Sequence, residues 1–233
     1  MEGQACQPIC AVDFSTSAGA ALDMELLDIL GKACKAPVYR VLGGPTPAAL
    51  DFVLSGNGVL TAGDAASVAA TVEAKHPLWF DEPCSLSNLE TVRKVSSETV
   101  VPLGFGKGVR DAGLFHALLR EGLVDVVRPE LAAFGITGTR RIAALAETYY
   151  VAVAPRHNAG PVGTAAAIHL AASIPNFFVQ HVPVPIAAED RTMRAALCSP
   201  NPEAVQGGFL ALLKAPGLGI TMNEAALEKY RAA

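Results

Sequence analysis

The sequence predicts an α/β fold with a parallel sheet, and three features of its 233 residues indicate this. Short β-branched or aromatic segments recur at regular intervals, and alanine-rich segments with helical spacing separate them. The predicted strands are apolar throughout, as expected when helices cover both faces of a sheet. The strands are predicted at 51–55, 78–80, 100–105, 124–127, 150–154 and 177–180, and the helices between them at 62–75, 89–97, 112–121, 139–148 and 163–173.

Two arrangements of such units fit this pattern: an open doubly wound sheet and a closed barrel. A nucleotide-binding open sheet would carry a glycine-rich phosphate loop, but the segment 104–108 lacks both the GxGxxG and the GxxxxGK(S/T) spacing. A tight strand-to-helix turn is the better interpretation of its glycines. A closed barrel needs eight βα units, and about six are recognisable here. The sequence therefore predicts an incomplete (βα)8 TIM-like barrel.

The chain is predicted to divide into three parts. Residues 1–48 contain one predicted helix at 18–32. Gly43-Gly44-Pro45 marks the end of this N-terminal segment. Residues 49–198 form the partial barrel. Residues 199–233 form a C-terminal segment with a turn at 216–219 and a short helix at 223–230, for which Asn223 is the predicted N-cap.

Composition excludes several classes of partner. The 18 Lys and Arg against 22 Asp and Glu give a formal net charge of −4 without a long basic run, so we expect no nucleic-acid partner. No unbroken apolar segment has the length of a membrane span, and residues 1–10 lack the basic and apolar regions of a signal peptide. Five scattered cysteines without a CxxC pair are typical of reduced thiols. We therefore expect a cytoplasmic protein that contacts no membrane.

Polar residues follow all six predicted strands at their carboxyl ends, which is where barrels carry their active sites. These residues are Asn57, Asp81 with Glu82, Lys107, Glu130, Arg156 with His157, and His181. Polar residues also follow strands that have no catalytic role, so spacing alone leaves a functional and a purely structural interpretation equally open.

Several motifs occur in an order that resembles one known family. The segments 27–33 and 37–44 resemble the end of a capping domain, and Phe80-Asp81-Glu82-Pro83 resembles a strand end of the barrel that follows it. Further matches lie at 57–58, 127–130 with 135–137, 153–155 with 160–161, 175–180 and 216–219. The combined order is similar to the enolase superfamily, in the mandelate racemase/muconate lactonizing enzyme branch that includes sugar-acid dehydratases such as galactonate dehydratase. The resemblance implies remnants of the α+β capping domain at both ends of the barrel.

The resemblance also implies a chemistry. Enzymes of this family abstract the proton α to a carboxylate, and Mg²⁺ held by three carboxylates of the barrel stabilises the enolate. An active relative would be a carbon–oxygen lyase that dehydrates sugar acids, or a racemase or epimerase. Its ligand would be a small carboxylate or a sugar acid. The second metal position corresponds to Asp81, with Glu82 beside it.

The chain departs from the family pattern at most of its functional positions. Ser55 stands at the first metal position and Lys107 at the third, where an ammonium repels Mg²⁺ instead of ligating it, so Mg²⁺ binding is in doubt. Arg156 occupies the position of the base histidine, and His157 follows one place later, which would turn its side chain to the other face of a strand. Glu130 and His181 replace two acids of the family. The first two barrel strands are missing.

Three interpretations follow from these departures. In a rebuilt lyase, His157 would be the base, Glu130 would orient it, and Lys107 or Arg156 would stabilise the enolate; in the alternative, His157 is a loop residue. In a non-catalytic pseudoenzyme or truncated product, Lys107, Arg128 and Arg156 would attract a carboxylate, although Arg128 could equally form a structural ion pair.

The resemblance places Asn57, Arg128 and His181 at the substrate-binding positions. In the third interpretation, the chain is an interaction subunit. It would then form a homo-oligomer or pair with a full-length relative that covers the open sheet edges.

Overall fold

The computed structural model describes residues 17–42, 53–183 and 185–231. Within these residues, five strands form a parallel sheet in the order β1-β2-β3-β4-β5, which confirms the predicted incomplete barrel. The strands are β1 (Leu54–Ser55), β2 (Phe80–Asp81), β3 (Leu103–Phe105), β4 (Val126–Val127) and β5 (Ala152–Val153). The predicted sixth strand runs beside β5 through one parallel bridge between Val153 and Phe177.

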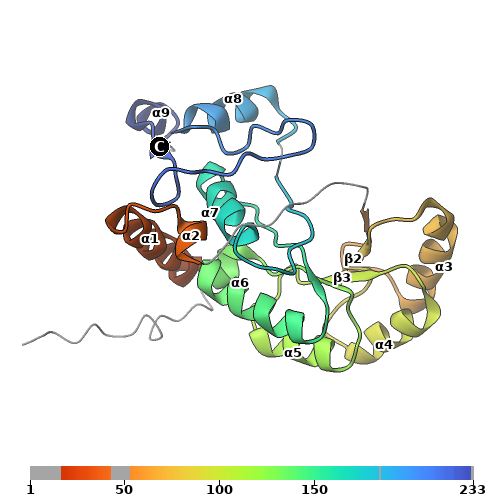
Figure 1. Cartoon of the computed structure of the whole chain (residues 1–233). Helices are drawn as coiled ribbons and strands as arrows, with labels where there is room; N and C mark the ends of the chain where they lie inside the picture. The colour runs from red at the N-terminus through yellow and green to blue at the C-terminus, as the bar shows by residue number, and fades with distance from the viewer. Residues whose placement is uncertain (1–16, 43–52, 184, 232–233) are drawn as a thin grey trace, which may run out of the picture.

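Helices connect successive strands and lie on the outside of the sheet, where they form an arc around it (Figure 1). Each predicted connecting helix is confirmed: α3 (Ala62–Val72) with η2 (Glu73–Lys75), α4 (Leu89–Glu98), α5 (Ala112–Arg120), α6 (Leu131–Thr148) and α7 (Pro161–Ala171). Three of them begin where a side chain accepts a hydrogen bond from the first turn, which fixes their start. These N-caps are Thr61, Asn88 and Asp111.

Helix α6 begins eight residues earlier than the sequence predicts (Leu131 against 139), because a short turn of helix precedes a kink. The kink lies at Gly135, where φ is +62°, a conformation that favours glycine. A Cβ atom there would lie 2.5 Å from Asp23 Oδ2 of α1 (Ser17–Ala33). The same carboxylate accepts a hydrogen bond of 2.9 Å from the Thr137 amide, so α1 caps the long part of α6.

The two ends of the described chain meet beside α1. Gly217 pairs with Pro37 in a parallel bridge, and the Val38 amide donates to the Gly217 carbonyl over 3.0 Å. The Leu218 amide donates to Asp28 Oδ1 of α1 over 2.6 Å. These contacts place the C-terminal segment against the N-terminal helices. The predicted boundary at residues 48 and 49 and the Gly43-Gly44-Pro45 stop lie outside the described residues.

The C-terminal part carries the predicted short helix, α9 (Glu224–Lys229), with Asn223 as its N-cap as expected. It also carries elements that were not predicted from the sequence, and these lie near α9 at the top of Figure 1. They are α8 (Ala188–Ala196), β6 (Cys198–Ser199) and β7 (Thr221–Met222), while the short α2 (Val38–Val41) follows α1. No helix of the described residues is long and apolar enough to cross a membrane.

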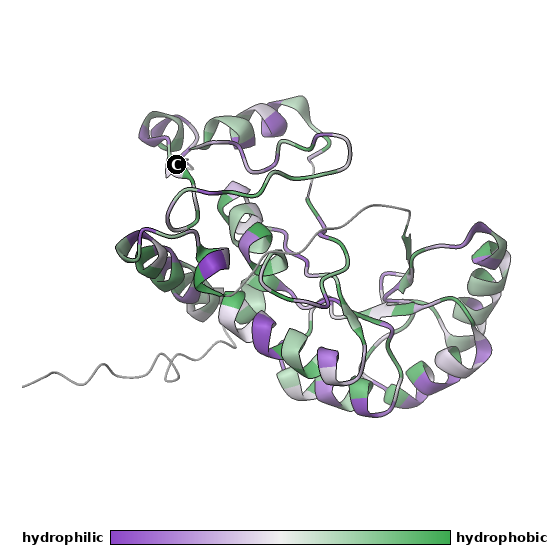
Figure 2. Ribbon diagram, in the orientation of Figure 1, coloured by the Kyte–Doolittle hydropathy of each residue, from purple (hydrophilic) through white to green (hydrophobic). Residues whose placement is uncertain are grey.

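Side chains that alternate along the strands build two separate apolar clusters. Phe80, Phe105 and Val127 point toward the helices and belong to the large core between helices and sheet. Trp79, Val126 and their neighbours Ala154 and Val179 form a smaller cluster on the inner side of the sheet. Figure 2 shows hydrophobic residues along the strands and over much of α1. The inner cluster forms the floor of the cavity described next.

Candidate functional site

A cavity of about 440 Å³ opens at the carboxyl ends of the strands. It lies between the β1 edge of the sheet, which contributes Val53 and Ser55, and the end of the sixth strand with the segment after it, which contribute residues 179–182. Its polar lining consists of Ser55, Asp81, Lys107, Arg128, Arg156, Gln180 and His181. Five of these seven residues were predicted from the sequence as metal, catalytic or substrate-binding residues.

Asp81 and Arg128 form a buried ion pair in the cavity wall. The Arg128 guanidinium contacts Asp81 Oδ1, and its Cζ lies 5.2 Å from the centre of the Trp79 ring. Trp79 Nε1 donates a hydrogen bond of 3.2 Å to the same Asp81 oxygen. The indole lies against Gly104 of β3, where a Cβ atom would be 2.2 Å from Trp79 Cδ1. Only glycine therefore leaves room for the ring that supports this pair.

Arg156 lies next to Glu130, which comes from the end of β4 and precedes α6. Arg156 Nε is 3.6 Å from Glu130 Oε2, too far for a hydrogen bond, while its Nη2 donates to Asn158 over 3.2 Å. Glu130 Oε1 is buried without a hydrogen-bond partner among the described residues. Burial raises the pKa of Glu130, and the positive charges of Arg156 and Arg110 oppose that rise.

Glu82 points away from the cavity, although it directly follows Asp81. Its backbone has a φ of +47°, and its Oε1 accepts hydrogen bonds from the amides of Gly106, over 2.6 Å, and Lys107. Burial raises the pKa of Glu82, while these two amide donors lower it. The carboxylate thus holds the loop between β3 and α5 in place.

Lys107 lies at the rim, where its Nζ contacts Asn57 Oδ1. His181 also lines the cavity; although part of its surface is exposed, partial desolvation of the ring together with the charges of Arg128 and Arg156 lowers its pKa. A neutral imidazole is therefore expected there at neutral pH. The structure thus brings Asn57, Lys107 and His181 to the same end of the sheet as the two arginines.

His157 is separated from the cavity. Its side chain is fully buried, and its Nε2 lies 3.4 Å from Thr164 Oγ1 of α7. Thr164 donates over 2.7 Å to Glu203, which in turn pairs with Arg194 of α8. Burial lowers the pKa of His157 to about 4. Arg156, one place earlier, lines the cavity instead, as the alternation of strand residues predicts.

The metal-ligand set does not assemble. Among the described residues, no group of three His, Cys, Asp or Glu side chains could hold a metal ion. Asp81 forms an ion pair with Arg128, and Glu82 accepts hydrogen bonds from two backbone amides. Lys107 occupies the position of the third metal ligand. Of the residues that the structure describes, three cations and one acidic side chain line the cavity, and this set does not fit Mg²⁺.

Trp79, Gln180 and the apolar lining residues were not predicted from the sequence as part of the site, and neither were the partners of His157. Trp79 is the chain's only tryptophan, and it lies two places before Asp81 on the same face of a predicted strand. That alternation was the available signal for it. Nothing in the sequence pairs Thr164 with Glu203, because the two residues belong to segments that are distant in the chain.

The fold and the cavity define a class of protein: a parallel α/β barrel, incomplete in this chain, with its polar site at the carboxyl ends of the strands. Residues 40–226 match the family model described as enolase C-terminal domain-like, so the chain belongs to this family. A solved mandelate racemase/muconate lactonizing enzyme from Jannaschia sp. CCS1 has a TM-score of 0.80 at 25% identity, over 93% of this chain and 75% of that one.

Curated relatives are named as sugar-acid dehydratases. D-gluconate dehydratase from Thermoproteus tenax is 30% identical over 78% of this chain and 36% of its own length. D-galactonate dehydratase from Ralstonia pickettii is 28% identical over 94% of this chain and 54% of its own length. The chain therefore spans about half, or less, of the length of the relatives it matches. These similarities confirm the family resemblance of the motifs.

Proposed function

We propose that this chain binds a small carboxylate in the cavity without a metal ion. One observation carries the proposal: Arg128 and Arg156 line the same cavity with side chains only 5% and 9% exposed, and each has an Nε without a hydrogen-bond partner within the described residues. The two Nε atoms themselves are closed off from solvent, so an anion in the cavity would be bound by the other N–H groups of the two guanidiniums. Guanidinium groups match the planar geometry of a carboxylate.

The charges around the cavity support an anionic ligand. Lys107 adds a third cation at the rim, while Asp81 is the one acidic side chain in the described lining. The same charges oppose a divalent cation, so we propose that the ancestral Mg²⁺-dependent proton abstraction is impaired or absent. The rebuilt-lyase alternative needs a base that faces the ligand, whereas His157 faces Thr164.

Binding is measured by titration calorimetry in buffer with EDTA. D-gluconate and D-galactonate, from the names of the relatives, are tested beside simple aliphatic carboxylates. The double variant Glu130→Gln with Arg156→Gln removes a charge pair without changing the net charge and should weaken binding at least about tenfold, because it removes one guanidinium. Absence of binding to every carboxylate by a cooperatively folding chain would contradict the proposal.

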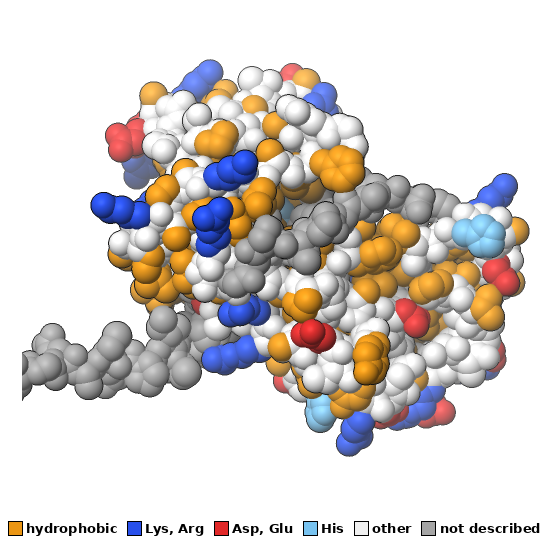
Figure 3. Space-filling view, viewed as in Figure 1, with side chains coloured by type: hydrophobic (Ala, Val, Ile, Leu, Met, Phe, Trp, Pro, Cys, Tyr) orange, Lys and Arg blue, Asp and Glu red, His pale blue; other side chains and the backbone are white. Residues whose placement is uncertain are grey.

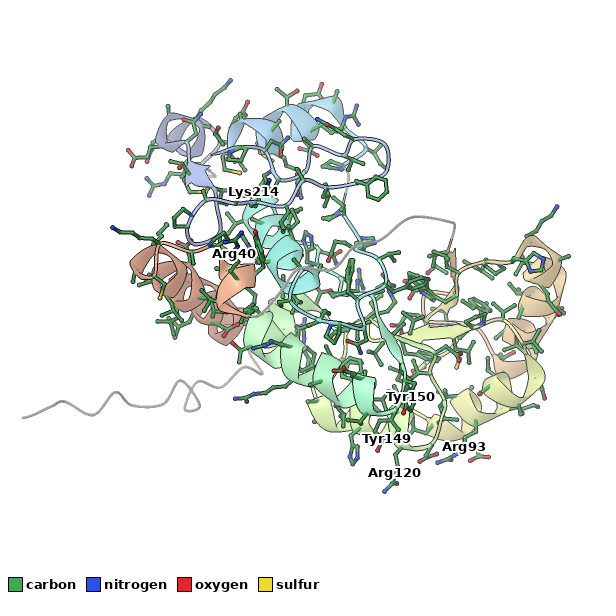
Figure 4. The ribbon with its side chains drawn as sticks, viewed as in Figure 1. Arg40, Arg93, Arg120, Tyr149, Tyr150 and Lys214 are labelled. Carbon is green, nitrogen blue, oxygen red and sulfur yellow. The ribbon has the colours of Figure 1, made fainter. Side chains whose placement is uncertain are left out.

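The matched control is Arg93→Gln. Arg93 lies on the outer side of α4, paired with Glu90 and Glu121, and away from the cavity (Figure 4). It should leave carboxylate affinity unchanged, since an exposed ion pair contributes little and lies far from the ligand. The same samples are assayed for dehydration of both sugar acids with Mg²⁺ present, and turnover that is lost with EDTA would favour the ancestral chemistry over our proposal.

A second candidate function is assembly, and the surface of α1 favours it. Leu22, Ile29 and Leu30 are exposed on this helix, and Figure 3 shows hydrophobic side chains gathered at the left of the molecule, where α1 lies. Exposed apolar surface of this kind favours self-association or pairing with a full-length relative. Light scattering coupled to size-exclusion chromatography tests this, and a monomer at all concentrations would contradict it.

A further inference from the structure

The parallel sheet ends at β1, and one side of this strand has no neighbouring strand among the described residues. On its other side, the Leu54 amide donates to the Trp79 carbonyl of the β2 segment over 3.3 Å. The Gly56 amide donates to the Asp81 carbonyl over 2.8 Å. Ser55 lies between these two residues, and successive peptide groups of a strand point to opposite sides. The Ser55 N–H and C=O therefore point away from β2, toward the open edge, where the N–H has no partner in the described part of the chain.

This open edge borders the cavity that holds the two arginines. Val53 and Ser55 of the edge line one side of the cavity, and residues 179–182 line another. Arg128 and Arg156 line the same cavity from the ends of β4 and β5. An unpaired strand edge is a template for a further extended chain. A polypeptide that pairs with the β1 edge therefore lies against the cavity, and its end can reach the guanidinium groups.

The direction of the strands decides which end of an added chain meets these cations. All five strands of the sheet run parallel, and the cavity opens at their carboxyl ends. A chain that pairs with β1 in parallel therefore brings its own carboxyl end toward Lys107, Arg128 and Arg156. An antiparallel chain would bring its amino end there, and like charges would repel it. Charge complementarity thus favours a free α-carboxylate at this end of the sheet.

The rest of the described lining is mixed in character, which suits the end of a peptide. Ser55 and His181 are polar, whereas Val53 and Val179 are apolar. The terminal residue of a polypeptide presents both an amide group and a side chain beside its carboxylate. Both kinds of lining therefore have something to contact, which a carboxylate group alone would not offer.

We infer that the carboxylate bound in this cavity is the C-terminus of a polypeptide, which adds to β1 as a parallel strand. This inference rests on the proposed carboxylate-binding function and deepens it by naming the ligand class. Hydrogen bonds between the two main chains, centred on the Ser55 peptide group, supply affinity that depends little on the sequence of the ligand. Arg128 and Arg156 select the free carboxylate, because guanidinium groups match its planar geometry.

The test uses an acetylated tetrapeptide of alternating threonine and valine, because these residues favour an extended backbone. One form ends in a free carboxylate and a second in an amide, while N-acetylvaline carries the carboxylate without the strand. Calorimetry of the whole chain in EDTA-containing buffer should give the free-acid tetrapeptide a dissociation constant about tenfold or more below that of either comparison.

Each other result counts against the inference. A free-acid tetrapeptide that binds no better than N-acetylvaline, or no better than its own amide, would overturn it. If D-gluconate or N-acetylvaline still binds, the carboxylate proposal stands without the strand. Absence of binding by all three carboxylates would overturn both.

Two proline variants test the edge itself. Ser55→Pro removes the outward N–H, and Leu54 before it is extended in β1, as a residue before proline requires. It should raise the dissociation constant of the free-acid tetrapeptide about fivefold or more. The matched control is Val100→Pro, an exposed position before β3 that follows the extended Thr99 and whose amide donates no hydrogen bond within the described residues. It should leave the tetrapeptide affinity unchanged. Thermal melts verify that both variants fold, and full tetrapeptide affinity in folded Ser55→Pro would contradict the pairing.

A modified ligand repeats the test without any variant. Because peptide groups alternate along a strand, only every second amide of the tetrapeptide faces β1. Two isomers, N-methylated at one or the other alternating set of amides, should therefore differ in affinity about tenfold on the natural chain. Equal affinities of the two isomers would contradict binding as an added strand.

Discussion

His157 provides the sharpest test of the side-chain placement. The structure buries it completely behind the cavity, with Nδ1 lacking a partner in the described part of the chain. Burial, together with the charges of His181 and Arg194, lowers its pKa from the ordinary 6.5 to about 4, against an opposing effect of Glu203. A histidine whose folded pKa lies below its unfolded value stabilises the protein above the unfolded pKa, and this contribution is lost as the pH falls through the folded value.

The magnitude follows from this difference in pKa. At pH 7 the His157 imidazole is largely unprotonated in both the folded and the unfolded chain. At pH 4.5 the unfolded histidine is protonated and the folded one is still largely neutral. Proton uptake by the unfolded chain therefore lowers the free energy of unfolding by roughly 2 to 3 kcal/mol between these two pH values. His157→Gln removes that contribution, because glutamine does not titrate.

Urea unfolding at a series of pH values between 7 and 4.5 measures the effect. The free energy of unfolding should fall more steeply for the natural chain than for His157→Gln, by about the amount above. His76→Gln is the matched control, since it makes the same substitution at an exposed position, and it should not reproduce the effect of His157→Gln. Equal slopes for the natural chain and His157→Gln would refute the buried, neutral placement of His157 and return it to the list of candidate bases.

Three further predictions concern the cavity. Gly104→Ala should destabilise the fold by about 2 kcal/mol or more, because its Cβ would collide with Trp79. Gly63→Ala, which adds a Cβ in open space on α3, should stabilise the fold by about 0.5–1 kcal/mol. Urea denaturation measures both free energies of unfolding. Arg128→Gln should cost about 3–5 kcal/mol by leaving the buried Asp81 charge uncompensated, and adding Asp81→Asn should recover much of the loss; non-recovery would speak against the ion pair. Millimolar Mg²⁺ should leave the melting temperature unchanged, and an EDTA-reversible increase would mean that the carboxylates can assemble around the ion.

Breaking the Arg128 pair and removing Arg156 have separable consequences. Arg128 is tied to Asp81 and to the Trp79 ring, so its loss disturbs both stability and binding. The Arg156 side chain lies at a longer distance from Glu130, and the hydrogen bond it donates within the described residues goes to Asn158. The Glu130→Gln and Arg156→Gln double variant should therefore report on binding with a smaller effect on folding.

The fold could be predicted wherever the local pattern of apolar residues shows which side chains are buried. The segments around Phe80, Leu103 and Val126 are apolar because they are buried in the protein. The spacing of alanine in the helices indicates the helix face that packs on the sheet. The strands are shorter than predicted, because apolar residues also occupy the loops at their ends: Val101 and Val124 are buried there, whereas Val100 and Tyr150 are exposed. Helix α8 escaped prediction, since its segment is rich in charged residues and none of its residues is buried in the core.

The site was predictable in its location and only partly in its chemistry. Strand ends converge in any parallel barrel, so the sequence placed Asp81, Lys107, Arg128, Arg156 and His181 at one end of the sheet, and the structure gathers all of them around one cavity. The sequence left open whether Arg128 was a ligand contact or part of a structural ion pair. The structure shows that it is paired with Asp81 and also lines the cavity.

By itself, the sequence determined the α/β class, the order of the units and the family, because periodicity and motif order are local properties of the chain. The tertiary structure alone decided which way each polar side chain faces. Glu82 turns out of the cavity because its backbone adopts a positive φ, and His157 faces α7 because it follows Arg156 by one residue. Such orientations depend on contacts between segments far apart in sequence, and these contacts exist only once the strands have assembled.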